Sequence, residues 1–392
     1  MRTVIAALAA ACALGSVPAL AQTTPTPAPS ASPSPSPSPS PTPRAWQASG
    51  FAAASYQLSS HPGGSGFAFA NGAASRVFDT ADRQPMLNAV NVQLVKSGTF
   101  GGKLELTAGS NADVIASFPT ANNDSFDVTQ AYLQYATGPF TLIAGKFETL
   151  AGAEVIEDPS NTQVSRSILF GYAVPFTHTG ARLSYAPSAL FTVNAGINNG
   201  WDNTKGNGTG GKTGEFGLAY NGAVVSLTAQ SYFGTERISN AAWASAAGSP
   251  AGHRSLVDVV GTYHVNPKLT LQGNFDTGRQ ENTPLVNGAG AVTASSGTAT
   301  WNGVAGYATY QLTPKFSASV RAETFSDGGG YRTGYDQRWR ETTLTFAYAP
   351  SAPVLFRIEG RADDSNQAVW FDSAGILRNT LQSVAAQVLV KF

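Results

Sequence analysis

One long segment of the chain, residues 148–177, carries charges of both signs and lies between two stretches of alternating residues. The segment contains four carboxylates and one guanidinium, a set that would favour cations if it lined a narrow aqueous passage. The ordinary alternative is a solvated loop. We predict that the segment folds inward, and the candidate constriction residues are Glu148, Glu154, Glu157, Asp158 and Arg166.

Further charges lie on segments that alternate between apolar and polar residues, the pattern of a β-strand. Val354, Phe356 and Ile358, for example, alternate with Arg357 and Glu359. A dry core could not hold such charges unless each was paired, so we expect them to face water inside a barrel. Acids and bases nearly balance, which predicts mild ion selectivity. The predicted pore-lining residues are Lys103, Glu105, Lys146, Arg182, Arg321, Glu323, Arg357, Glu359 and Arg361.

Other chemistries leave little trace in the sequence. The four histidines form no metal-ligand spacing with one another or with cysteine. The glycine-rich run GNGTGG lacks the lysine and helix of a phosphate-binding loop, and no Gly-x-Ser-x-Gly motif is present. A catalytic triad assembled only in space would leave no such motif. We predict a protein that is not an enzyme and that needs no metal or cofactor.

The composition points to an exported β-protein. Of 392 residues, only 12% are charged, the formal net charge is zero, and 41 are glycine. This balance gives no reason to expect a nucleic-acid partner. After the N-terminus, no apolar run approaches the roughly 20 residues of a membrane helix. A secreted all-β adhesin would share much of this composition.

The N-terminal segment is typical of an export signal. Arg2, an apolar run and the small residues Ala19 and Ala21 predict a cleaved signal peptide over residues 1–21. The only cysteine, Cys12, leaves with it, and lipidation of Cys12 is a weaker alternative. Residues 22–44 alternate Pro and Ser and predict a disordered spacer. Contact of this spacer with the cell wall is a further hypothesis.

From residue 45 to 392 we count sixteen strands, joined alternately by short turns and long links. Asn221-Gly222 is a strong hairpin signal, and Asn266-Pro267-Lys268 is a typical short turn. The later long links are expected around 199–213, 234–254, 278–300, 326–337 and 362–379. The fold predicted is an all-β transmembrane antiparallel β-barrel of about sixteen strands, with short periplasmic turns and long extracellular loops.

Aromatic residues support this orientation. Tyrosine is enriched at membrane interfaces, and six tyrosines share the apolar face near the short turns. They are Tyr135, Tyr185, Tyr220, Tyr263, Tyr310 and Tyr348. The last strand alternates apolar residues and ends at Phe392. We predict that Phe392 is an assembly signal for the barrel-assembly machinery, and that its deletion removes little packing.

Several stretches together resemble a known family. They are SGFAAASYQL, PMLNAVNVQLVKSGTFGGKLELTAG, the long segment from DVTQAYLQYATGPF through GKFETLAGAEV to PFTHTGARLSYAPS, and NAGINNGWDN. The chain resembles the OmpL-like β-barrel porins (porin-2 type) of Gram-negative bacteria, over nearly all of residues 48–392. The resemblance implies an outer-membrane porin of unassigned substrate, without catalytic residues or a ligand site.

Two functions remain open. One is passive diffusion of small hydrophilic solutes or ions through a water-filled barrel, which a sixteen-stranded barrel is wide enough to allow. The other is a non-conducting outer-membrane barrel that acts as an adhesin or structural anchor. The expected surroundings are outer-membrane lipid, and the sequence leaves a homotrimer open.

Overall fold

The structure, a computed structural model, describes residues 46–61, 66–117, 125–205, 210–237 and 251–392. The predicted signal peptide and the Pro/Ser-rich spacer lie outside the described residues. None of the helices in these ranges is long and apolar enough to cross a membrane.

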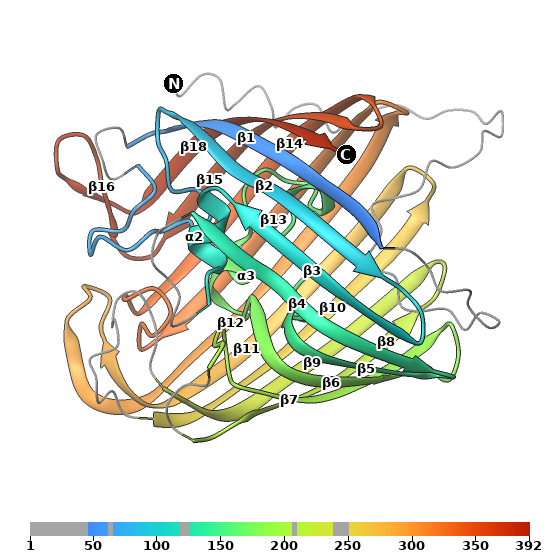
Figure 1. Cartoon of the computed structure of the whole chain (residues 1–392). Helices are drawn as coiled ribbons and strands as arrows, with labels where there is room; N and C mark the ends of the chain where they lie inside the picture. Colours follow the sequence, from blue (N-terminus) through green and yellow to red (C-terminus); the bar gives the residue numbers. More distant parts are fainter. Residues whose placement is uncertain (1–45, 62–65, 118–124, 206–209, 238–250) are drawn as a thin grey trace.

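Sixteen strands close into one antiparallel barrel (Figure 1), which confirms the predicted fold. Each strand pairs with its neighbour in the chain, and the last strand pairs with the first to close the ring. The barrel strands are β1 (Gln47–Ser59), β2 (Pro85–Lys96), β3 (Phe100–Ala108), β4 (Phe126–Thr137), β5 (Phe140–Glu148), β6 (Thr177–Tyr185), β7 (Phe191–Asn198), β8 (Thr213–Asn221), β9 (Val225–Arg237), β10 (Ala251–Asn266), β11 (Leu269–Val286), β12 (Val292–Thr313), β13 (Phe316–Gly328), β14 (Gln337–Ser351), β15 (Val354–Ser365) and β18 (Thr380–Lys391).

The remaining elements lie in the long links. They are α2 (Ser110–Ile115), η1 (Asp158–Ser160), α3 (Ile168–Tyr172), β16 (Trp370–Phe371) and β17 (Leu377–Arg378). β16 and β17 form a separate two-stranded sheet between β15 and β18. The short turns lie at their predicted positions. The prediction of a long link around residues 278–300 is wrong. β11 and β12 stay paired as far as Val286 and Val292, because the small and β-branched residues there continue the ladder despite their loop-like composition.

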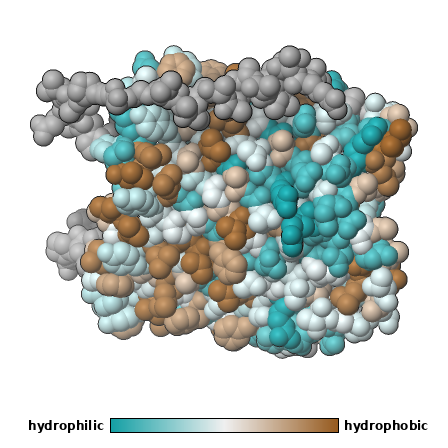
Figure 2. All heavy atoms as spheres, turned by 180° about the vertical axis from the view of Figure 1, so that it is seen from behind, coloured by the Kyte–Doolittle hydropathy of each residue, from teal (hydrophilic) through white to brown (hydrophobic). Residues whose placement is uncertain are grey.

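The two faces of the barrel wall differ as the alternation predicted. On β15, Phe356 and Ile358 are exposed on the outside, whereas Arg357, Glu359 and Arg361 are buried inside. Figure 2 shows hydrophobic residues gathered over the left part of one outer face and hydrophilic residues toward the right. The wall therefore has an apolar exterior and a charged interior, the reverse of a soluble barrel.

An aromatic rim lies at the short-turn end of the barrel. Four of the predicted tyrosines face a phenylalanine on the neighbouring strand, with ring centroids 4.4–5.2 Å apart. The pairs are Phe100 with Tyr135, Phe140 with Tyr185, Phe191 with Tyr220, and Phe316 with Tyr348. Each phenylalanine is the first residue of its strand. Amphipathic and apolar rings thus alternate along this rim.

The barrel closes where β1 meets β18. Beyond the paired ladder, the backbones of Gly50 and Phe392 exchange two hydrogen bonds of 2.9 and 3.0 Å. The Phe392 ring covers Gly50 so closely that a Cβ on Gly50 would lie 2.7 Å from it. Phe392 therefore contacts the closing seam through its backbone and one ring edge, while 66% of its surface stays exposed. The effect of its deletion stays a prediction.

Candidate functional site

The link between β5 and β6, residues 149–176, runs across the inside of the barrel, and we call it the third loop. It reaches β13, which lies eight positions from β5 in either direction around the ring and so forms the opposite wall. Gly152 has a φ of 100°, a conformation that glycine adopts most readily. Ser167 caps α3 by accepting a 3.0 Å hydrogen bond from the Phe170 amide. Gly152 and the Ser167 cap therefore determine the local backbone conformation of the loop where it crosses the barrel.

β13 holds the loop through two charged side chains. The carboxylate of Glu323 accepts hydrogen bonds from the amides of Ile168 and Leu169, at 2.7 and 3.1 Å. These two amides begin α3, where a negative charge is favourable. Arg321 donates to Glu154 at 2.7 Å and to the Ser165 carbonyl at 2.9 Å. We predicted that Arg321 and Glu323 face water, but both side chains bind the third loop instead.

β15 repeats this arrangement. Arg357 donates to the carbonyl oxygens of Asn161 and Gln163, both at 2.7 Å. Glu359 accepts from two loop amides, at 2.6 and 3.0 Å, and Arg361 donates to a loop carbonyl at 2.7 Å. The five predicted pore-lining residues of β13 and β15 are thus all buried under the third loop. Loop carbonyls and amides take the place that water was expected to fill, which is the physical reason for the difference.

Three of the predicted constriction residues are also paired and buried. Glu154 bonds Arg321 and the Ser167 amide, the latter at 2.7 Å. Asp158 accepts from Asn111 at 2.9 Å and from Arg166 at 3.2 Å. These contacts compensate the charges of Glu154, Asp158 and Arg166, so neutralising the acids is expected to cost stability as well as to alter the local field.

The other two constriction residues, Glu148 and Glu157, lie on the opposite side of the loop. Together with Glu105 on β3 they form the glutamate group, in which one oxygen of each lies within 4.8 Å of the others. Lys103 lies 2.7 Å from Glu105 and 3.9 Å from Glu157. Burial, together with the negative charge of Glu105, raises the pKa of Glu157 to about 7, against the opposing effect of Lys103. Both Lys103 and Glu157 keep 14% of their side-chain surface exposed.

Arg182 lies on the inner face of β6, as predicted, and is also paired. It bonds Glu215 on β8 at 2.6 Å, and its guanidinium lies 4.3 Å from the centre of the Phe147 ring. Lys146 on β5 is also buried and paired. Its ammonium bonds both oxygens of Asp127, at 2.9 and 3.0 Å.

The sequence reasoning missed an apolar cluster inside the barrel, which we call the aromatic cluster. Rings from four links and two strands meet there, and the ring centroid of Trp339 lies 5.3 Å from that of Phe69 and 5.8 Å from that of Trp370. Its main members are Phe69, Tyr172, Trp201, Trp301, Trp339 and Trp370. The links looked polar because they are rich in Gly, Asn and Ser. Isolated aromatic residues within those links were the available signal.

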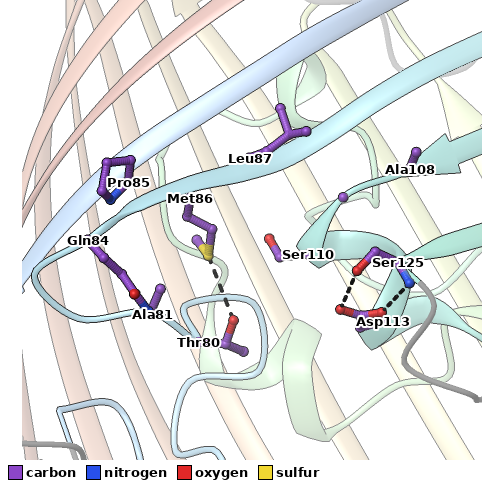
Figure 3. A pocket seen from close by; sticks show the side chains of 11 residues that line it. Thr80, Ala81, Gln84, Pro85, Met86, Leu87, Ala108, Ser110, Asp113 and Ser125 are labelled. Carbon is purple, nitrogen blue, oxygen red and sulfur yellow. Dashed lines mark hydrogen bonds between the residues drawn. The ribbon is translucent and has the colours of Figure 1, made fainter.

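A separate surface pocket of about 640 Å³ lies beside β2 and α2 (Figure 3). Asp113 lies at its side and accepts hydrogen bonds from the amide and hydroxyl of Ser125. None of the predicted site residues lines this pocket. It is therefore distinct from the charged interior.

The family model described as "Putative beta-barrel porin-2, OmpL-like" matches residues 48–392. The chain belongs to this family. The match spans the whole described barrel, and the interior contacts above are therefore those of a porin-2 barrel. No curated protein matches the chain in sequence.

Three solved structures share the fold of this porin-2 chain. DcaP, an outer membrane channel of Acinetobacter baumannii, is 12% identical, with a TM-score of 0.61 over 88% of this chain and 97% of that chain. An anion-selective porin from Comamonas acidovorans is 11% identical, with a TM-score of 0.60 over 89% and 99%. OmpT, an outer membrane protein of Vibrio cholerae, is 10% identical, with a TM-score of 0.59 over 88% and 97%. At such low identities the structural likeness shows the shared barrel fold alone. The family supports a porin role and an outer-membrane location.

Proposed function

We propose that the chain is an outer-membrane channel through which small hydrophilic solutes or ions diffuse passively. The observation that carries this proposal is the crossing of the third loop to the opposite wall, with charges left partly exposed on its other side. Because the loop docks on β13 and β15, the remaining passage runs between the loop and β3–β5. Lys103, Glu148 and Glu157 then form its constriction, where charges in a narrow space act strongly on passing ions.

The proposal places the aromatic rim and short turns at the periplasmic side, with lipid around the apolar exterior. Phe392 is then the signal read by the barrel-assembly machinery. One structural neighbour of the fold is described as a trimer form of Vibrio cholerae OmpT, with a TM-score of 0.58. This supports a homotrimer for the present chain as part of the proposal. Family and fold favour a channel over an enzyme.

Planar-bilayer recording of the purified protein tests the proposal. We expect stepwise conductance, with a mild preference for cations that comes from the glutamate group. A matched variant, Glu148→Gln with Glu157→Gln, should lower the cation-to-anion permeability ratio but leave the number of insertion events unchanged. A correctly folded barrel that inserts without conductance would refute the channel.

The aromatic cluster favours a second candidate, the non-conducting barrel. Inward links meet at its rings, and a seal that covered the whole cross-section would leave the outer links as the working surface for adhesion or anchoring. Replacement of Trp339 and Trp370 by Ala distinguishes the two candidates. Conductance that appears only in this variant would support the closed barrel, and conductance already present in the wild type would exclude it.

A further inference from the structure

Two carboxylates face each other inside the barrel wall. Asp258 on β10 and Asp276 on β11 are direct register partners, so their side chains share one face. Both residues are 0% exposed. Bringing two negative charges together away from water is costly unless a positive charge compensates them.

The structure provides no such charge among the described residues. Asp258 Oδ2 accepts a 2.7 Å hydrogen bond from Asn274. The two carboxyl groups lie within hydrogen-bonding reach of each other. Neither oxygen of Asp276 nor Oδ1 of Asp258 has a donor among the other described side chains. Gln230 on β9, the register partner of Asp258 on its other side, also has an unpartnered side-chain nitrogen.

The pair lies directly beneath the start of the third loop. Asn274, which bonds Asp258, accepts a 3.0 Å hydrogen bond from the Ala153 amide. The amide of the preceding residue, Gly152, approaches Asp258 itself. A ligand held by the two aspartates would therefore act on the position of the loop through these amides.

We propose that Asp258 and Asp276 together bind one divalent cation, Ca²⁺, beneath the third loop. The free donors are all carboxylate oxygens, which hard cations prefer, and Ca²⁺ tolerates irregular coordination. A proton shared between the two carboxyl groups would provide partners for two of the three free oxygens. A divalent cation between the two carboxylates would also neutralise both charges.

The glutamate group differs from the aspartate pair because its negative charge is already compensated. Lys103 already supplies a cation at 2.7 Å from Glu105. The Glu105 carboxylate also accepts hydrogen bonds from Asn91, Gln93 and Gln130, at 2.8–3.1 Å. The aspartate pair has neither a basic neighbour nor a full set of donors. The inference therefore concerns the aspartate pair and does not depend on the proposed channel function.

Calcium binding to the full mature chain, refolded in detergent without lipopolysaccharide, tests the proposal. Barrels are prepared with EDTA or with CaCl₂ and dialysed, and bound calcium is counted by elemental analysis. Urea unfolding is then followed by circular dichroism. We expect one Ca²⁺ per barrel, and at 100 times the Kd the unfolding constant should fall about 100-fold. Asp276→Asn, which keeps the shape of the side chain, should abolish both effects.

Two results would overturn the proposal. One is a wild-type barrel without bound calcium whose stability depends on pH alone, which would mean that a proton occupies the pair. The other is loss of calcium from the Glu148→Gln, Glu157→Gln variant with retention in Asp276→Asn, which would assign the ion to the glutamate group. Retention in the glutamate variant and loss in the aspartate variant supports the proposal. Neither readout uses conductance.

Discussion

Arg321 on β13 and Glu154 in the third loop form a 2.7 Å ion pair in which both side chains are buried. Arg321 also bonds Glu341 on the neighbouring strand at 3.0 Å, so one guanidinium links the wall to the loop. A buried pair of this kind contributes little net stability as a whole, but the loss of one partner leaves an uncompensated charge. The pair is therefore a sensitive point for testing whether the loop position controls conduction.

Replacement of Arg321 by Met should release the loop from the opposite wall. We expect a loss of about 3–5 kcal/mol in the free energy of unfolding, and a larger, noisier single-channel conductance. Arg338→Met is the matched control, because Arg338 is exposed on the outside of β14 and its loss should change stability by less than about 0.5 kcal/mol. Identical conductance in both variants would contradict control by the loop position.

The helix α3 offers a test that involves no charge. Leu169 is fully buried in the apolar interior, whereas Leu150, in the same loop, is 40% exposed. Leu169→Ala should cost about 2–5 kcal/mol through the cavity it leaves, and Leu150→Ala much less. Urea unfolding in detergent measures both variants. Equal costs would show that the loop does not dock through α3.

The pKa of Glu157, raised from its ordinary value of 4.5 to about 7, predicts a pH-dependent selectivity. As the pH rises through 7, the carboxyl loses its proton and the passage gains negative charge. The cation-to-anion permeability ratio should therefore rise between about pH 6 and pH 8. Reversal potentials under a salt gradient measure this ratio.

The raised pKa of Glu157 also determines whether stability rises or falls with pH. Between pH 4.5 and about 7, the folded protein holds a proton on Glu157 that the unfolded chain has released. Stability should therefore fall as the pH rises through this window. Glu157→Gln should flatten both pH dependences, whereas Glu281→Gln, an exposed acid paired with Arg279, should preserve them. A variant Glu157→Gln with the wild-type profile would assign the titration to another group.

Deletion of Phe392 should affect both the stability of the closing seam and the assembly of the barrel. The closing seam loses two backbone hydrogen bonds and the ring that covers Gly50. Assembly in cells should fall further if the terminal aromatic residue is also read as a signal. Phe392→Leu separates these effects, because it keeps the backbone bonds and removes the aromatic ring. Normal surface levels and normal heat resistance after deletion would contradict both roles.

The strands were predictable because period-two alternation and short Pro- or Gly-containing turns are local signals. β15 shows this well, with its apolar exterior and charged interior readable from the residues alone. The partner of Lys146 was not predictable, because Asp127 lies on the neighbouring strand β4 and no local pattern records that contact. The hairpin end of β11 and β12 was missed because its composition resembles a loop.

The interior was predicted less well because its contacts join distant parts of the chain. The sequence indicated that Arg357 and Glu359 face inward, but it could not show that loop carbonyls and amides occupy their hydrogen-bonding positions. The aromatic cluster was hidden for the same reason, since its rings come from links and strands that are far apart in the chain. Side-chain direction is a local property, whereas the partner of a side chain is a property of the whole fold.

The diametric crossing of the third loop has a consequence for the order of folding. Its bonds to β13 and β15 join residues 154–199 positions apart in the chain, far beyond the reach of a local hairpin. When residues so far apart in the chain come together, the chain loses conformational entropy before the contacts between them form. Such contacts are therefore expected to form late in folding. The curled sheet must bring the two walls to opposite sides before the loop finds its partners. During refolding, protection of the Ile168 and Leu169 amides from hydrogen exchange should therefore lag behind protection of the β13–β14 ladder.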